Sequence, residues 1–251
     1  LEAARAEVVA AVCDEARKQS LRVWVHAHGD DSIRRVVAGK CTTVVHGSLA
    51  TPPTFTLMAN AGVLFEPTVG VVTQNYIAHE KNYTGIGNYT PDAFVNMKAF
   101  VQGQGQRWKT MFSTAPKLVI ISGSDAVGGA EGHNVEEVIF RVQNGWPAME
   151  GIVSATSRNA KAIALDKTIG TLKPGLQADI IAVDGDALAD ITALRIEVIE
   201  LRPVDDPVRS FPGPDVVLRV FGVDGGEILI PCIEQIMKRG GQMGAFEEAK
   251  W

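Results

Sequence analysis

Three short runs of this chain, rich in β-branched residues, each end on a side chain that can bind a metal ion. The runs are residues 21–26, 41–46 and 117–125, and they end on His26, His46 and Asp125. In a (β/α) barrel the carboxyl ends of the strands open into one shared mouth, where the chemistry takes place. The pattern therefore predicts that these three side chains meet around one ion.

Stretches with helical spacing of apolar residues separate the strand-like runs. We expect strands over residues 21–25, 42–45, 62–66 and 118–122, and helices over 2–19, 31–38, 54–60, 91–111, 134–142 and 147–165. Strands that alternate with helices are typical of a parallel α/β architecture. A closed barrel needs eight such units, so residues 1–166 predict a partial (β/α) barrel domain, half a barrel at most. Its open strand edges would need a cover, from a missing segment or a partner chain.

The character of the chain changes in the C-terminal part. Residues 167–251 combine a turn rich in glycine and proline with short apolar runs. Residues 216–220 and 227–230 flank Asp224-Gly225-Gly226, which is a hairpin signal. We therefore predict a small β-rich domain after the partial barrel.

Composition excludes several classes of protein. The 251 residues are 46% hydrophobic and 21% charged, with a net charge of −5. Nucleic-acid binding would need a clustered basic face, and the sequence contains none. The uncharged stretch 41–65 contains His46 and two prolines, so we expect no membrane span. Three cysteines without a CxxC pair predict no disulfide framework, which favours a reducing, cytoplasmic compartment. The chain begins without an initiator Met, so we expect a longer parent.

Four short segments together resemble the metal-dependent amidohydrolase superfamily, and among its members most closely the prolidase-like, imidazolonepropionase-related ones. They are Val23-Trp-Val-His-Ala-His-Gly29, Thr43-Val-Val-His-Gly-Ser48, Ser122-Gly-Ser-Asp-Ala126 and Ile169-Gly-Thr-Leu-Lys-Pro-Gly-Leu-Gln-Ala-Asp-Ile180. The resemblance covers roughly residues 1–195, and their order and spacing make the set specific. It also makes residues 196–232 look like an insertion.

The resemblance implies a TIM (β/α)8 barrel with one or two divalent ions, zinc above all, at the strand ends. It matches His26 to the metal ligand on strand 5, His46 to the ligand on strand 6 and Asp125 to the ligand on strand 8. The H-x-H of strand 1 and the lysine of strand 4 have no match. The chain is thus expected to be the C-terminal half of the barrel, strands 5–8.

A competing alignment would make His26-Ala27-His28 the H-x-H of strand 1. Seven further strand–helix units would then have to fit before Asp125. A βαβ unit takes about 30 residues or more, so they do not fit. The strand-5 alignment therefore holds, and the rest of the barrel is expected before Leu1 or on another chain.

The expected reaction is hydrolysis of a C–N bond in an amide or peptide. A divalent ion lowers the pKa of bound water to about 7 and polarises a carbonyl. Asp125 is expected to orient the water, accept its proton and pass it to the leaving amine. A prolidase-like enzyme acting on a small carboxylate-bearing substrate is the leading interpretation. A cyclic amidohydrolase of imidazolonepropionase type and a non-catalytic fragment of a larger barrel stay open as alternatives.

Further residues are candidates for substrate contact. His133 lies in the Gly-rich stretch 128–134, and Tyr76 lies in an expected loop after the third strand. His28 is the third candidate for substrate contact, and we expect it to face the opposite side of its strand from His26. The expected partners are a small-molecule or dipeptide substrate, and a second copy of the chain or the missing N-terminal half of the barrel.

Overall fold

The structure is a computed structural model that describes residues 6–177, 181, 183 and 185–195 and two strands beyond them. The chain divides into two compact units, Leu1–Ile163 and Ala164–Trp251. No helix among the described residues is long and apolar enough to cross a membrane.

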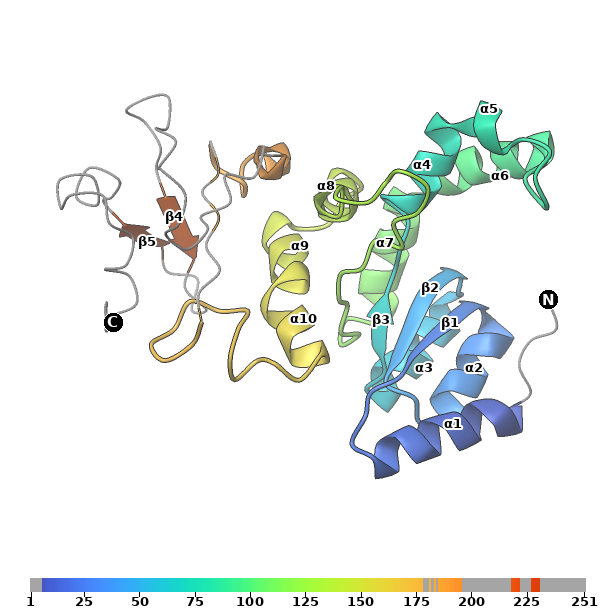
Figure 1. The fold of residues 1–251 in the computed structure, drawn as a ribbon, viewed down its shortest axis with the longest axis horizontal. Helices are drawn as coiled ribbons and strands as arrows, with labels where there is room; N and C mark the ends of the chain where they lie inside the picture. Colours follow the sequence, from blue (N-terminus) through green and yellow to red (C-terminus); the bar gives the residue numbers. More distant parts are fainter. Residues whose placement is uncertain are drawn as a thin grey trace. The chain divides into compact units, whose positions relative to one another are not determined.

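A parallel sheet organises the first unit (Figure 1). Its strands β1 (Trp24–Gly29), β2 (Thr43–Leu49) and β3 (Leu64–Glu66) lie side by side in chain order. The parallel arrangement that the alternation predicted is therefore present. Because the strands are parallel, their three carboxyl ends lie at the same end of the sheet.

The fourth expected strand, residues 118–122, joins the sheet beside β3 but is not a regular strand. A parallel bridge pairs Phe65 with Ile120. The Phe65 amide donates to the Val119 carbonyl at 3.0 Å, and the Ile121 amide donates to the Phe65 carbonyl at 2.9 Å. The segment that leads to Asp125 thus follows β3 in the expected order.

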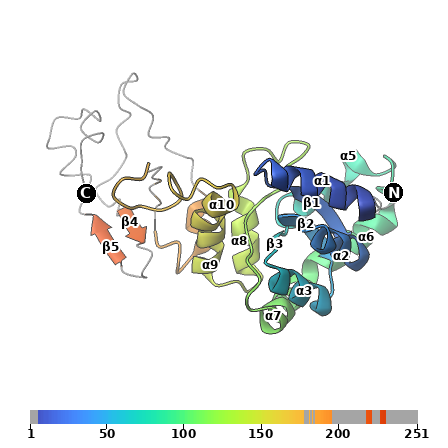
Figure 2. The ribbon, with the colours of Figure 1, turned by 90° about the horizontal axis from the view of Figure 1, so that it is seen from below.

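Ten α-helices in the described part of the first unit connect and cover the strands (Figures 1 and 2). They are α1 (Ala6–Lys18), α2 (Asp30–Ala38), α3 (Pro52–Ala61), α4 (Val72–Ala78), α5 (Glu80–Tyr83), α6 (Pro91–Gln102), α7 (Gln104–Thr114), α8 (Val135–Gln143), α9 (Ala148–Ala155) and α10 (Ser157–Ala162).

Three predictions about helices are wrong. The single helix expected over 91–111 is two helices, because Gly103 ends α6 and begins α7. The helix expected over 147–165 breaks at Thr156, whose backbone (φ −118°, ψ −98°) is not helical. The loop expected around Tyr76 is formed by α4 and α5.

The main core lies between the sheet and helices α2, α3 and α7. Each of these elements contributes side chains that are at most 1% exposed, among them Ile33, Val44, Phe55, Phe65 and Trp108. Full burial of one such apolar side chain contributes roughly 1.5–3 kcal/mol. This packing holds β2 and β3 in place, and with them the strand ends.

A disulfide joins Cys13 of α1 to Cys41, which follows the turn after α2 and lies two residues before β2. Both side chains are buried, and the two Cα atoms lie 5.1 Å apart. The expectation of no disulfide framework is therefore wrong for this pair. The odd cysteine count hid it, because pairing depends on how α1 packs and not on spacing in the sequence.

The described part of the second unit contains a turn, a short helix and a hairpin. The Gln177 amide donates to the Thr168 carbonyl at 2.8 Å across the turn. A 3₁₀ helix, η1, follows over Ile191–Leu194. The expected hairpin is present as the antiparallel pair β4 (Leu218–Phe221) and β5 (Glu227–Ile230). The rest of the proposed insertion 196–232 lies outside the described residues.

Candidate active site

Three histidines gather at the carboxyl ends of β1 and β2. His26 Nδ1 lies 2.5 Å from His46 Nε2, and the two ring centroids are 4.7 Å apart. The ring of His28 stacks on that of His46 with centroids 4.5 Å apart and planes 1° from parallel. The structure thus brings together the two predicted ligands from neighbouring strands, with a third imidazole beside them.

The prediction for His28 was wrong. Side chains along a strand alternate with a period of two, so residues 26 and 28 share a face, and Ala27 lies on the other. Ala27 is 2% exposed and belongs to the core, whereas His26 and His28 are both exposed. His28 Nδ1 contacts the Ser48 hydroxyl at 2.7 Å. His28 therefore belongs to the histidine cluster.

The backbone of His46 is in the left-handed region, with φ +72°. His46 pairs in register with Ala27, whose side chain points into the core. Regular alternation would turn His46 the same way, so the left-handed backbone accounts for its facing the other two imidazoles. Gly47 follows at φ +52°, and a Cβ there would lie 2.5 Å from the Phe65 ring. Strain of this kind costs of order 1–3 kcal/mol and clusters at functional sites.

Burial keeps His46 neutral. Its side chain is 8% exposed. Burial and the neighbouring His28 and His26 lower the pKa of His46 to about 4, against the opposing charge of Asp125. The pKa of His28 is also lowered, first by partial desolvation of its ring and then by His26, while Asp125 raises it. Neutral imidazole, with its free lone pair, is the form that binds a metal.

The Thr68 hydroxyl contacts Nδ1 of His46 at 2.6 Å and orients the ring. This contact leaves Nε2 to face Nδ1 of His26 at 2.5 Å, and both nitrogens are available as ligands only when neither carries the proton. Two nitrogens that bind one tetrahedral zinc at about 2.0–2.1 Å each lie farther apart than this, so the two rings would separate slightly to admit an ion. A partner behind the ring that fixes its orientation is typical of histidines that bind metals. The donor atoms of the histidine pair are therefore of the kind that suits a divalent ion such as zinc.

Asp125 follows the segment beside β3 and has an exposed side chain and a left-handed backbone (φ +49°). Its charge opposes burial in setting the pKa of both His28 and His46, which places it in their neighbourhood. However, no group of three or more His, Cys, Asp or Glu among the described residues is arranged to hold a metal ion. Asp125 as a third ligand stays a prediction.

A carboxyl group that sequence reasoning missed lies on the same side of the sheet. Trp24 Nε1 donates to Glu66 Oε2 at 2.8 Å, and Trp24 shares the face of His26. Burial raises the pKa of Glu66, against the bond from Trp24 and the charge of Arg141. A Cβ on Gly123 would lie 2.0 Å from Glu66 Oε1, so glycine at 123 lets the segment before Asp125 approach this carboxyl.

Arg107 of α7, also missed, holds the chain just after His46. Its guanidinium donates to the carbonyls of Gly47, Ser48 (2.9 Å) and Ala50 (3.3 Å). Burial lowers its pKa to about 10, against the charge of Asp30, so it stays charged at neutral pH. Nothing in the sequence marked this arginine, because its partners are backbone atoms some sixty residues away.

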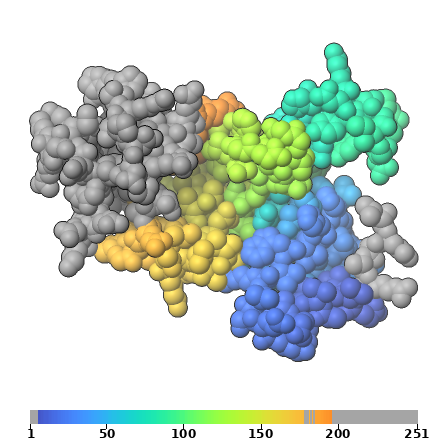
Figure 3. Space-filling model, in the orientation of Figure 1, coloured from blue at the N-terminus to red at the C-terminus, as the bar shows by residue number. Residues whose placement is uncertain are grey.

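The other two candidates for substrate contact lie outside the histidine cluster. Tyr76 of α4 packs edge-on against Tyr83 (centroids 4.9 Å apart) and lies 4.8 Å from Tyr89. These tyrosines lie in the lobe of α4–α6, which is coloured teal in Figure 3. His133 is exposed in the Gly-rich loop. Among the residues that the structure describes, its ring has no contact with the three histidines.

Residues 3–204 match the family model described as the amidohydrolase family. A parallel α/β arrangement with histidines at its strand ends agrees with this match. The chain belongs to the amidohydrolase family.

Three proteins illustrate what this chain is similar to. It is 25% identical to the ochratoxinase of Aspergillus niger over 187 residues, which are 74% of this chain and 37% of that protein. A Xaa-Pro dipeptidase with methionine in its active site is 27% identical, with a TM-score of 0.62 over 76% of this chain and 45% of the other. A prolidase bound to N-methylphosphonate-L-proline shares the fold (TM-score 0.67, 22% identity) over 90% of this chain and 49% of its own. The chain thus spans half or less of each relative.

Proposed function

We propose that this chain is part of a metal-dependent hydrolase of amide bonds that acts, as prolidases do, on a small substrate with a free carboxylate. The observation that carries the proposal is the 2.5 Å approach of His26 Nδ1 to His46 Nε2 at the ends of neighbouring parallel strands. The relatives support it, because their names describe a Xaa-Pro dipeptidase, a prolidase and an ochratoxinase.

In this proposal the chain is the C-terminal half of a TIM barrel. Its strands β1 to β3 and the segment 118–122 would be strands 5 to 8. The chain spans 37% to 49% of the three relatives, which supports this assignment. The ligands of strands 1 and 4 would then come from the N-terminal half of the barrel, and the open edges would be covered by that half or by a second copy.

His26 and His46 would hold the ion, and one or two zinc ions suit this donor set. Bound zinc would supply a Lewis acid for the carbonyl and a water of low pKa. His46 contributes a neutral ring whose orientation Thr68 fixes through Nδ1. Asp125, exposed beside the cluster, would accept a proton from the attacking water and return it to the leaving nitrogen.

Zinc affinity measured against a chromogenic chelator tests the proposal. Replacing both ligands (His26→Asn with His46→Asn) should weaken zinc binding by more than about 100-fold, since even residues that support a ligand contribute about 10- to 100-fold. The control is His79→Asn, an exposed histidine that bonds its own helix through the Asn75 carbonyl and should leave the affinity unchanged.

A second arm uses turnover of an Xaa-Pro dipeptide by the chain assembled with its N-terminal half. Asp125→Asn should lower turnover by about 10²–10⁴ while zinc stays bound, because general base catalysis is worth that much. Equal zinc binding by the wild-type chain and the double histidine variant would contradict the proposed site. Full turnover by Asp125→Asn would contradict the role of Asp125.

A further inference from the structure

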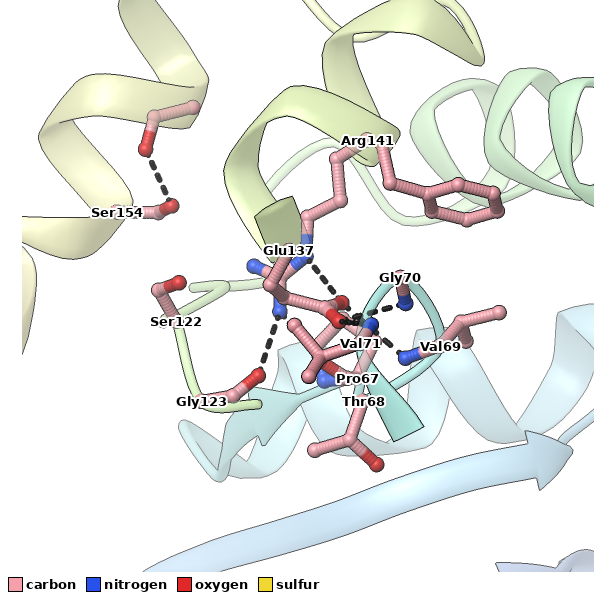
Figure 4. Close-up of polar contacts among 12 residues, drawn as sticks. Pro67, Thr68, Val69, Gly70, Val71, Ser122, Gly123, Glu137, Arg141 and Ser154 are labelled. Atoms are coloured by element: carbon pink, nitrogen blue, oxygen red, sulfur yellow. Dashed lines mark hydrogen bonds and ion pairs between the residues drawn. The ribbon is translucent and has the colours of Figure 1, made fainter. Parts of the chain in front are cut away.

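A fully buried ion pair lies in α8, away from the histidine cluster. Glu137 and Arg141 are both 0% exposed, and Arg141 Nε donates to Glu137 Oε1 at 3.0 Å (Figure 4). Removing two charges from water costs several kcal/mol per ion, and their attraction offsets this only where hydrogen bonds satisfy the remaining atoms. The identity of those further partners shows what the pair holds.

The further partners of Glu137 lie on the chain that leaves β3. Its carboxylate accepts from the amides of Val69 (3.2 Å), Gly70 (2.6 Å) and Val71 (3.1 Å). Gly70 is needed for this approach, because a Cβ there would lie 2.6 Å from Cβ of Phe140. Glu137 thus fixes the backbone at the end of the third strand.

The partners of Arg141 connect this same turn to the neighbouring segment. Its guanidinium donates to the carbonyls of Pro67, Ile121 (2.9 Å) and Gly123 (3.5 Å), and it lies 5.2 Å from the centre of the Trp146 ring. Asn159 of α10 holds the residue between, since it accepts from the Ser122 amide at 3.0 Å and donates to the Ser122 carbonyl at 2.8 Å. Two strand ends are therefore fixed from one buried side.

Both fixed segments lead directly to the proposed site. Thr68 lies between Pro67 and Val69, and its hydroxyl contacts His46 Nδ1 at 2.6 Å with a side chain that is 6% exposed. Asp125 follows Gly123 by two residues. A shift of either segment would therefore move the group that orients His46 or the carboxylate beside the cluster.

We propose that Glu137 and Arg141 are positioning residues of the active site, which hold Thr68 against His46 and fix the chain that carries Asp125. This inference rests on the proposed function for its link to zinc. It gives the buried pair a role beyond stability, and that role can be separated from stability. Replacing a buried ion pair with apolar residues of similar size is often neutral or stabilising, whereas removing one partner leaves an unpaired buried charge.

The test therefore uses the double variant Glu137→Leu with Arg141→Met. It should keep cooperative unfolding, because no charge is left buried alone. It should nevertheless bind zinc about 10- to 100-fold more weakly, as expected when a residue that supports a metal ligand is lost. Thr68→Val should weaken zinc binding to a similar degree, and Thr68→Ser, which restores the hydroxyl, should recover it. Arg158→Gln, which removes the partly exposed ion pair with Glu150, should leave zinc affinity unchanged.

A folded double variant with wild-type zinc affinity would overturn the proposal. If that variant does not fold, wild-type affinity in Thr68→Val overturns it. If the wild-type chain binds no zinc, the proposed function fails, but the positioning role is still tested by the ¹⁵N shift of His46 Nδ1. The shift should change in Thr68→Val, and it should change in the same way in the double variant. An unchanged shift in the double variant would refute the positioning role.

Discussion

At the scale of single residues, His46 leads to a prediction about pH. Its pKa is lowered to about 4 in the folded chain by burial and by His28, against about 6.5 when unfolded. The unfolded chain therefore binds more protons between these values, and stability falls as the pH drops from about 6.5 towards 4. The full loss is about 3 kcal/mol, since each pKa unit corresponds to 1.36 kcal/mol.

The measurement is urea unfolding of the metal-free chain between pH 7 and pH 4, with the ring of His46 titrated by NMR. His46→Asn supplies the comparison, because asparagine tolerates a positive φ and does not titrate. The difference in stability between the two proteins should depend on pH in this window. A difference that is flat, or a His46 midpoint near pH 6.5, would show that the ring is not held neutral.

The sequence predicted that His26 and His46 lie close together, and they do, because parallel neighbouring strands carry their ends to one place. Their role as metal ligands stays a prediction. The prediction for His28 failed because residues two apart on a strand share a face, whereas His26 and His28 were assigned to opposite faces. Thr68 and Arg107 were missed for a different reason. They act through contacts 22 and 60 residues away, with a ring and with backbone carbonyls, and neither forms a motif. Such supporting residues become visible only when the chain is folded.

At the scale of elements, the disulfide between α1 and the turn before β2 should stabilise the first unit. It closes a loop of 28 residues, and restricting the unfolded chain in this way is worth roughly 3–4 kcal/mol in the chain-entropy model. Reduction, or Cys13→Ala with Cys41→Ala, should lower the free energy of unfolding by about this amount. Cys232→Ser keeps the pair and serves as the control.

The measurement is urea unfolding with and without reductant. Wild type and Cys232→Ser should lose stability when reductant is added, and the double alanine variant should not respond. A wild-type chain that unfolds at the same urea concentration in both conditions would show that the cysteines are not paired in solution.

Helix α3 was predictable because local signals bound it at both ends. It begins at Pro52 and ends at Ala61, where the left-handed backbone of Gly62 (φ +68°) caps it. The segment 118–122 shows the limit of local signals. Its residues suit a strand, but it pairs through one bridge beside β3, and side chains of α8 and α10 satisfy much of its remaining backbone. Its state therefore depends on tertiary contacts.

At the scale of the whole molecule, the parallel order of the sheet was predictable from the alternation of strands and helices. Among the described strands β1 pairs with β2 alone, and no other described strand covers its second edge. An open edge presents unpaired amides and carbonyls that invite another strand. In the proposed half-barrel this edge is where the preceding strand of the barrel would pair.

The chain on its own should therefore associate through the edge of β1. The Thr43 amide donates to the Val23 carbonyl at 3.1 Å, so Val23 and Val25 turn their backbone groups towards β2 while Trp24 and His26 turn theirs towards the open edge. Light scattering should give a mass above the 26.9 kDa of one chain at micromolar concentration. Hydrogen exchange should find the amides of Trp24 and His26 protected in the associated form and exposed after dilution.

The Val25 amide, which faces β2, is the internal control and should stay protected in both. A chain that is monomeric at every concentration, with Trp24 and His26 exchanging freely, would show that the edge of β1 needs no partner strand.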